Sequence, residues 1–448
     1  MRLTIKEPEI NIGTDGFKDH CLLERTSTGR KLSELVEKIA DPIVIALDGS
    51  WGSGKSFFLK CWTGAHTNEN GGKAKVIYFD AFKHDYLDDP LVSLVSALLP
   101  HFPDSKKKTS GISKMKSASM KLAKPLARVG FSVGTSGLSE LSGPIVDALI
   151  SSSGKEFEKL VDGMWAKEEG RINAVEEFRT ALEKLTEPDK EGVPQKIVII
   201  IDELDRCRPD YALTMLEVIK HFFAVDNVLF VLGVNLTELE NSVKARYGTG
   251  IDAERYLQKF IHLRMELPNK VGTGTEFDAI PITYISTLAT ELSIPKYLVT
   301  IIQDYLRISQ GGLNLSLRSV QRLSSILALI PRNLENKVQE YKNVVAGAAI
   351  IKAFSPELYS SMLNGDVTMV QINKFFKFSS QRKNTGNVAE QFRLSWLAFM
   401  DFDKYQQKNQ KSGNLSQLNE YDYDDDWLIR TLNDLLETFE LLEEPPQQ

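Results

Sequence analysis

Cysteine is scarce in this chain, with three residues among 448. Cys21, Cys61 and Cys207 lie far apart and form no CxxC pair, so the sequence excludes a disulfide framework and gives no support for a zinc site. Such cysteine usage fits a reducing compartment, and we expect a cytoplasmic protein.

Long apolar runs are also missing. Residues 1–8 lack the apolar core of a signal peptide, and no stretch reaches the run of about 18 apolar residues that a membrane-spanning helix requires. The sequence therefore predicts no transmembrane segment, which agrees with a cytoplasmic location.

Neither sign of charge is in large excess. The chain has 54 Lys and Arg against 60 Asp and Glu, a net charge of −6, which is too acidic for a polycationic nucleic-acid coat but leaves local basic patches open. Apolar residues make up 42% and charged residues 25%, as in ordinary folded proteins. The length suggests two or three domains, at roughly 100–200 residues each.

Short apolar runs alternate with longer helical patterns up to Pro268, where the strand signal fades. The runs that predict strands are 43–47, 76–79, 197–201, 228–234 and, as a fifth, 261–267. The patterns that predict helices lie at about 31–40, 55–66, 90–101, 171–185, 211–224, 236–246 and 252–260. This alternation predicts an α/β fold with a mainly parallel sheet, because crossover helices join buried parallel strands.

The strongest chemical signal is a loop directly between the first predicted strand and a helix. It matches the pattern GxxxxGK[ST] and is expected to bind nucleotide through Gly49, Ser50, Trp51, Gly52, Ser53, Gly54, Lys55, Ser56 and Phe57. Glycines let the backbone turn its N–H groups toward phosphate oxygens, and the following helix adds the positive end of its dipole. Lys55 would hold the β- and γ-phosphates, and Ser56 would coordinate Mg²⁺. A glycine turn that merely joins strand to helix would explain neither side chain.

Two acidic residues, Asp202 and Glu203, end the most apolar predicted strand. At the carboxyl edge of a parallel sheet they would lie beside the phosphate loop, where Asp202 would hold the Mg²⁺ shell. Glu203 would point toward the γ-phosphate and polarise an attacking water, which makes it the candidate catalytic base. Acids that only cap the next helix are the alternative, which suits Asp205 and Asp210 better than this pair.

One asparagine and several basic residues are further candidates for the reaction. The Asn235 amide would contact the water or the γ-phosphate if the strand 228–234 neighbours the one ending at Asp202; a turn-forming asparagine is the alternative. Arg206 is the first choice for stabilising charge in the transition state. The other basic candidates are Arg208, Arg255, Lys259, Arg318, Arg322 and Arg332. Each of the seven, Arg206 included, is more often a surface or ion-pair residue.

A segment at about 104–155, between the second and third predicted strands, is rich in lysine, serine and glycine. It has no acidic residue from Ser105 to Ser139, so its partner could be an anionic surface of a membrane or a nucleic acid. We favour a solvated loop, or a helix packed on another subunit, because surface lysine runs are usually solvated. Nucleic acid is left open but not favoured, since no Phe, Tyr or Trp lies between Lys106 and Arg128.

Together with the phosphate loop, further segments make the chain similar to the KAP family of P-loop NTPases. Residues 201–209 resemble the family's extended Walker B motif, which has an acidic pair followed by Leu-Asp-Arg-Cys and a proline. Residues 79–83 resemble its aromatic-Asn-Ala-Trp-basic segment, with Asp80 in place of Asn and Phe82 in place of Trp. Later segments of the family are matched, in the same order, at 231–235, 256–260, 315–322 and 331–334. The resemblance covers about residues 15–340.

The resemblance implies an ASCE-type P-loop fold, with the catalytic glutamate on the Walker B strand and a helical lid behind it. We therefore predict a P-loop NTPase core at 1–270, a helical lid at 271–364 and a helical, acidic C-terminal region at 365–448. ATP rather than GTP is implied, as is an anti-phage or signalling role in bacteria. Many relatives carry transmembrane helices between the two Walker motifs, but the basic insertion takes that place here, so membrane residence is not carried over.

We therefore expect a Mg²⁺-dependent ATP hydrolase that acts as a conformational switch, forms a homo-oligomer and regulates a protein partner or effector in anti-phage defence. Because residues 365–448 hold no second enzymatic motif, any destructive step would belong to a partner. One alternative is a scaffold that binds nucleotide without turnover and recruits its partner through acidic C-terminal residues, Asp422, Asp424, Asp425, Asp426 and Glu440. A nucleic-acid-stimulated ATPase is the other.

Overall fold

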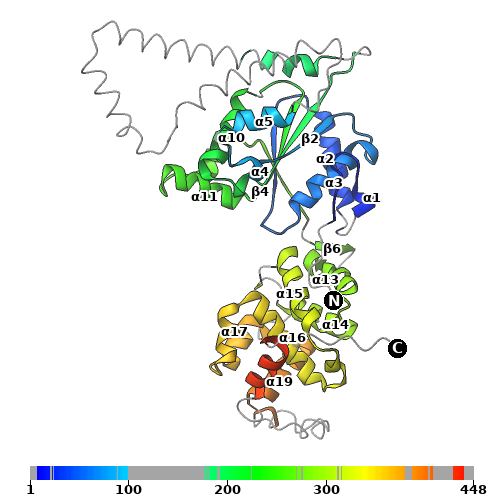
Figure 1. Ribbon diagram of the computed structural model, residues 1–448, viewed down its shortest axis with the longest axis vertical. Helices are drawn as coiled ribbons and strands as arrows, with labels where there is room; N and C mark the ends of the chain where they lie inside the picture. Colours follow the sequence, from blue (N-terminus) through cyan, green and yellow to red (C-terminus); the bar gives the residue numbers. More distant parts are fainter. Residues whose placement is uncertain are drawn as a thin grey trace, which may run out of the picture.

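The computed structural model describes residues 8–98, 176–406 and 427–437, apart from short interruptions. These interruptions are residues 21–22, 24, 88, 177–178, 181, 189–191, 223, 269, 274–275, 310–311, 314, 379–385 and 402–403. The insertion at 104–155 and the acidic residues Asp422, Asp424, Asp425, Asp426 and Glu440 lie outside the described part. The described chain forms an α/β part and a helical part, which follow one another along the long axis (Figure 1).

A five-stranded parallel sheet forms the centre of the α/β part, in the order β2-β3-β4-β1-β5. Its strands are β1 (Val44–Asp48), β2 (Lys75–Asp80), β3 (Ile197–Asp202), β4 (Val228–Val234) and β5 (Leu263–Glu266). The five predicted strands and the α/β P-loop fold are therefore confirmed. Strands β1, β3 and β4 are buried along their whole length, which explains why their sequences are continuous apolar runs without alternation.

Helices cover both faces of the sheet. The longer ones are α2 (Thr26–Lys38), α3 (Lys55–Asn68), α5 (Pro90–Leu98), α10 (Pro209–Phe222) and α11 (Leu236–Tyr247). Helices α2 and α3 share one core with strand residues such as Ile45 and Ile200, while α5, α10 and α11 share another with Ala46 and Ile199. The short elements are α1 (Phe17–His20), α4 (Ala81–His84), the 3₁₀ turn η2 (Leu204–Arg206) and α12 (Ala253–Leu257).

The carboxyl ends of the parallel strands share one edge of the sheet. The loop after β1, the acidic pair after β3 and Asn235 after β4 meet there. Backbone hydrogen bonds connect these ends, since the N–H of Gly49 donates to the carbonyl of Val234 (3.2 Å) and that of Glu203 to the carbonyl of Gly233 (3.1 Å). The topology thus brings together segments that are far apart in the sequence.

A short antiparallel hairpin, β6 (Lys270–Thr273) and β7 (Glu276–Ala279), follows the sheet. The strand signal of the sequence fades after Pro268, so the sequence does not predict this hairpin. Within the described chain, each hairpin strand has four residues and pairs with the other alone. Neither therefore carries the long apolar run that signals a buried strand.

One hydrophobic core runs through the helical part, from Ile282 to Leu436. Tyr305 and Phe392 stack in it with ring centroids 3.9 Å apart, and the indole N–H of Trp396 donates to the Tyr305 hydroxyl at 3.0 Å. Helices on both sides of residue 364 therefore share this core within the described chain. They are α13 (Ile280–Leu292), α14 (Lys296–Ile308), α15 (Leu317–Leu329), α16 (Gln339–Phe354), α17 (Pro356–Leu363), α18 (Met369–Phe376), α19 (Gly386–Met400) and α21 (Trp427–Leu432), with the 3₁₀ turn η3 (Arg332–Asn336).

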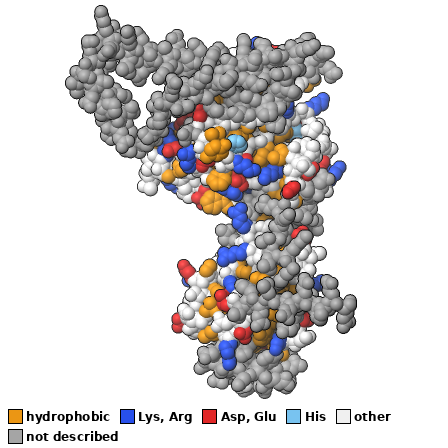
Figure 2. All heavy atoms as spheres, viewed as in Figure 1, with side chains coloured by type: hydrophobic (Ala, Val, Ile, Leu, Met, Phe, Trp, Pro, Cys, Tyr) orange, Lys and Arg blue, Asp and Glu red, His pale blue; other side chains and the backbone are white. Residues whose placement is uncertain are grey.

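The described surface carries many charged side chains (Figure 2). Figure 2 shows Lys and Arg side chains on the face where the α/β part and the helical part meet. Across the residues described, no helix is both long enough and apolar enough to cross a membrane.

A buried histidine joins α3 to α2. His66 is fully buried, with Nδ1 3.0 Å from Ser33 Oγ and Nε2 3.1 Å from Glu37 Oε1. Burial lowers the pKa of His66 below its usual 6.5, although the Glu37 charge opposes this shift. The folded chain therefore favours the neutral imidazole.

We expect the α/β part to lose stability as the pH falls below about 6.5, because the unfolded chain then binds a proton that the folded chain takes up less readily. His66→Gln should remove this contribution, so its urea midpoint should change less than that of the parent between about pH 7.5 and 5. His221→Gln, at an exposed position of α10, is the matched control. Identical pH profiles for the parent and His66→Gln would contradict the expectation.

Candidate functional site

Two glycines shape the phosphate loop, residues 49–54. Gly52 and Gly54 have φ values of 75° and 86°, in the left-handed region that glycine adopts without steric cost. Gly54 is also the N-cap of α3, and as a glycine it has no side chain that could cap the N–H groups of that first turn. The buried hydroxyl of Ser53 has no hydrogen-bond partner within the described chain. The loop therefore offers N–H and O–H donors to an anion, as phosphate-binding helix N-termini do.

Lys55 begins α3 and is almost fully buried, with 7% of its surface exposed. Its ammonium donates to the backbone carbonyls of Gly49 and Ser50, the latter at 3.2 Å. Burial lowers the pKa of Lys55, and nearby carboxylates, Asp205 first and then Asp202, oppose that shift. The amine therefore lies inside the phosphate loop and close to the acidic residues that follow β3.

Asp202 is fully buried at the end of β3. Its Oδ2 accepts a hydrogen bond of 2.6 Å from the Tyr78 hydroxyl, and its Oδ1 accepts one of 3.0 Å from the Glu203 N–H. Burial raises the pKa of Asp202 to about 6, even though the donated hydrogen bonds act in the opposite direction. Gly233 leaves room for the carboxylate, since a Cβ there would lie 2.3 Å from Oδ1. The neighbouring strands β2 and β4 thus hold this carboxylate in place.

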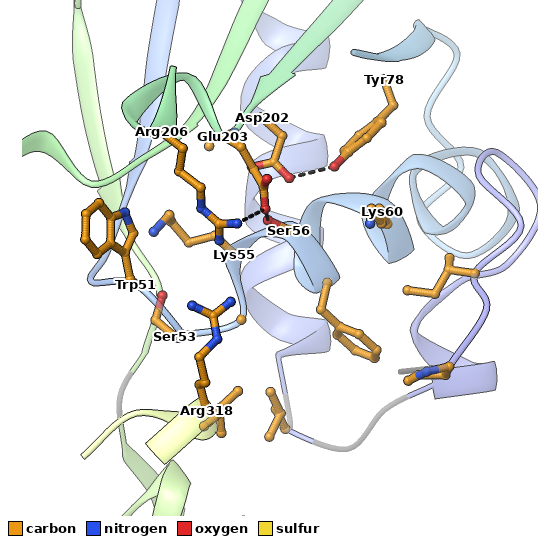
Figure 3. Close-up of a pocket in the computed structure, with 18 of the residues that line it drawn as sticks. Trp51, Ser53, Lys55, Ser56, Lys60, Tyr78, Asp202, Glu203, Arg206 and Arg318 are labelled. Carbon is orange, nitrogen blue, oxygen red and sulfur yellow. Dashed lines mark hydrogen bonds and ion pairs between the residues drawn. The ribbon is translucent and has the colours of Figure 1, made fainter. Parts of the chain in front are cut away.

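Glu203 follows in a backbone conformation that is uncommon for its residue type. Its φ of 60° lies in the left-handed region, and such non-glycine residues cluster at functional sites. Its Oε1 accepts a hydrogen bond of 3.4 Å from Ser56 Oγ and lies 2.9 Å from Arg206 Nη1 (Figure 3). The Ser56 hydroxyl also lies close enough to Asp202 to act against the rise in that carboxylate's pKa, so both carboxylates approach the first turn of α3.

The oxygen atoms of Ser56, Asp202 and Glu203 suit a hard divalent cation such as Mg²⁺. They are hydroxyl and carboxylate donors from α3 and the end of β3. Neither at this site nor elsewhere does the described chain have a group of three or more His, Cys, Asp or Glu side chains arranged to hold a metal ion. A magnesium ion would therefore need phosphate oxygens as further ligands, as in nucleotide sites.

These residues line a cavity of about 510 Å³ between the sheet and the helical part. Residues 51–57, Tyr78 and the acidic pair form one side, and Leu317 and Arg318 of α15 form another. The Leu317 N–H donates to the Gly52 carbonyl at 2.9 Å, so the helical part contacts the phosphate loop directly. The remaining lining residues include Lys60, Lys83, Tyr284, Gln321 and, from the N-terminal segment, Pro8, Glu9, Ile10, Ile12 and Leu23.

Among the predicted basic candidates, Arg206 and Arg318 line this cavity. Arg206 is paired with Glu203, whereas the side chain of Arg318 extends from α15 toward the phosphate loop (Figure 3). Arg208 pairs with Asp85 at 2.9 Å instead. Of the others, Arg255, Lys259 and Arg322 do not line the cavity, and the side chain of Arg332 lies outside the described part.

Asn235 lies between β4 and α11, directly after the strand that neighbours β3, as its predicted role requires. It is the N-cap residue of α11, and its side chain makes no capping hydrogen bond. The described cavity lining does not include it. Its contact with water or a γ-phosphate stays a prediction.

Trp51 connects the phosphate loop to the turn after β3. Its indole N–H donates to Oδ2 of Asp205 at 2.6 Å. Helix capping is the alternative that the sequence leaves open for Asp205; in the structure its carboxylate lies buried and holds the loop residue Trp51. This contact places η2 beside the phosphate loop.

The sequence does not predict Tyr78 or Gly233 as site residues. A tyrosine is ordinary in a strand and carries no signal of its partner. A lone glycine in an apolar strand does indicate a close approach of another group, and this signal could have identified Gly233. The N-terminal and helical-part residues reach the cavity only through the tertiary fold.

Comparison with known proteins identifies one family. The sequence profile of the KAP family P-loop domain matches residues 25–334, which is more than half of the chain. No curated protein matches the chain.

Similar solved structures are distant. The ORC2 protein of Aeropyrum pernix in its ADPNP-ADP complexes has 10% identity and a TM-score of 0.35, with 96% of each chain covered. Its ADP form has 11% identity and a TM-score of 0.32, covering 84% of this chain and 86% of that chain. A RuvB variant of Thermotoga maritima has 10% identity and a TM-score of 0.26, covering 86% of this chain and 91% of that chain. TM-scores this low add nothing about function.

Gly233→Ala should destabilise the chain by about 1–3 kcal/mol, because the new Cβ would lie 2.3 Å from Asp202 Oδ1 and 2.6 Å from Leu59 Cδ1. Gly250→Ala is the matched control, since a Cβ there meets nothing within 4 Å. Urea unfolding of both variants and the parent measures the difference. A Gly233→Ala midpoint equal to that of Gly250→Ala would show that the carboxylate is not confined as described.

Proposed function

The chain belongs to the KAP family of P-loop NTPases, and we propose that it binds ATP with Mg²⁺ beside the phosphate loop and hydrolyses it as a conformational switch. One observation carries this proposal. A phosphate loop, the acidic pair of buried Asp202 and half-buried Glu203, and an arginine of the helical part line the same cavity. Nucleotide binding alone would not require the carboxylate pair, whereas hydrolysis uses both of its members.

In the proposed complex, N–H groups of the first turn of α3 and the Lys55 ammonium bind the phosphates. Ser56 and Asp202 would hold Mg²⁺, which would neutralise phosphate charge when bound. Lys55 is already positioned inside the loop by the carbonyls of Gly49 and Ser50. The buried environment strengthens these charge interactions, because little water screens them.

In the proposed hydrolysis, Glu203 is the base that accepts the proton of the attacking water. A water attacks the γ-phosphorus, the bond from that phosphorus to the ADP oxygen breaks, and the carboxylate of Glu203 accepts the proton of the water. Arg206, which pairs with Glu203 at 2.9 Å, orients this carboxylate, and Arg318 supplies positive charge from the helical part.

The switch follows from the contact between α15 and the phosphate loop. Leu317 donates to Gly52, and a Cβ on Gly52 would lie 3.0 Å from Arg318 Cβ, so the two parts are closely packed there. A nucleotide in the cavity would touch both parts, and loss of the γ-phosphate would change their contact. The proposal also includes a protein partner that senses this change and a homo-oligomer. The family resemblance adds an anti-phage setting.

A second candidate is a scaffold that binds nucleotide without turnover. The Glu203–Arg206 ion pair favours it, since the Arg206 guanidinium already holds the carboxylate oxygen Oε1, at 2.9 Å, that would otherwise face the attacking water. Parent turnover indistinguishable from the buffer blank, combined with tight ATP binding, would identify the scaffold.

Lys55→Ala and Glu203→Gln separate binding from hydrolysis. Lys55→Ala should weaken ATP binding about 10- to 100-fold, because a charge-assisted contact to phosphate is lost. Glu203→Gln should bind ATP like the parent while turnover falls about 10²–10⁴-fold, because the base is removed. Phosphate release and the fluorescence of a labelled ATP measure the two effects. Unchanged turnover in Glu203→Gln would refute the assigned base.

Arg318→Ala should reduce the preference for ATP over ADP about 10-fold, because its positive charge would no longer reach the γ-phosphate side of the cavity. Arg322→Ala is the matched control, since Arg322 lies one turn further along α15, is exposed and does not line the cavity. Competition of ATP and ADP against a labelled nucleotide measures the preference. Equal preferences in the two variants would remove Arg318 from the site.

A further inference from the structure

Tyr78 is a polar residue at a place where the sheet is otherwise apolar. It lies on β2, two residues before the strand ends, and packs with the core that α2 and α3 share with the sheet. Its hydroxyl extends from that core to the cavity, where it donates to Asp202 Oδ2 at 2.6 Å (Figure 3). A phenol at neutral pH keeps its proton, so the direction of this hydrogen bond is defined.

The two oxygens of Asp202 are held by donors from different elements. Oδ1 accepts the Glu203 N–H from the turn after β3, and Oδ2 accepts the Tyr78 hydroxyl from β2. Pairing of β2 with β3 in parallel register, with Tyr78 opposite Ile200, brings the hydroxyl within reach. With both donors present, the plane of this fully buried carboxylate cannot turn without breaking a hydrogen bond.

We propose that Tyr78 is a positioning residue that orients the Asp202 carboxylate toward Ser56 and the magnesium ion of a bound nucleotide. This inference rests on the proposed function, since it concerns the same metal site. Groups that hydrogen-bond a metal-ligating carboxylate keep it in the geometry that binding requires, and their loss typically costs about 10- to 100-fold in metal affinity. The phenol ring fills the core, whereas the hydroxyl acts on Asp202.

Tyr78→Phe tests the hydroxyl alone, because it keeps the ring. We expect the Mg²⁺ concentration for half-maximal binding of a fluorescent ATP analogue to rise about 10-fold or more, with nucleotide affinity in EDTA unchanged. Tyr297→Phe in the full chain is the matched control, since it removes a buried hydroxyl that has no hydrogen-bond partner within the described residues. Its Mg²⁺ midpoint should equal that of the parent.

The outcomes are distinguishable. A Tyr78→Phe midpoint equal to the parent's overturns the positioning role and leaves the proposed function intact. A loss of affinity that is as large in EDTA as in Mg²⁺, accompanied by a lower thermal midpoint, also overturns it, because the hydroxyl then acts on folding. A parent whose nucleotide binding does not depend on Mg²⁺ overturns the proposed metal site and this inference together.

Discussion

A carboxylate buried at the carboxyl edge of the sheet is the constraint on which the site depends. Asp202 has no exposed surface, and burial raises its pKa to about 6, so its charge is costly without partners. Hydrogen bonds from Tyr78 and the Glu203 N–H offset part of that cost, and Gly233 provides the space. These contacts exist only while β2, β3 and β4 remain paired in their observed register.

The phosphate loop couples this edge to the helical part. Trp51 of the loop donates to Asp205 beyond β3, while Gly52 accepts from Leu317 at the start of α15. The loop is therefore in contact with the turn after β3 on one side and with the helical part on the other. A ligand that reorders the loop would act on both, which is how a P-loop site can transmit the presence of a phosphate.

Local patterns predicted the strands well and the helical part less completely. Continuous apolar runs located β3 and β4 because strands buried on both faces need no polar alternation. The hairpin β6–β7 gave no such signal, since four-residue strands that pair only with each other need no long apolar run. The shared core on both sides of residue 364 depends on contacts such as Tyr305 with Phe392, which join helices distant in the chain.

By itself, the sequence determined the phosphate loop, the acidic pair and their positions at strand ends, because glycine, lysine and carboxylate patterns are local. Only the tertiary structure decided which groups meet there. The Tyr78 hydroxyl on Asp202, Arg206 on Glu203 and Arg318 at the cavity join side chains whose partners depend on strand register, turn geometry and helix packing. Such contacts form only when folding brings distant segments together, so no local sequence pattern predicts them.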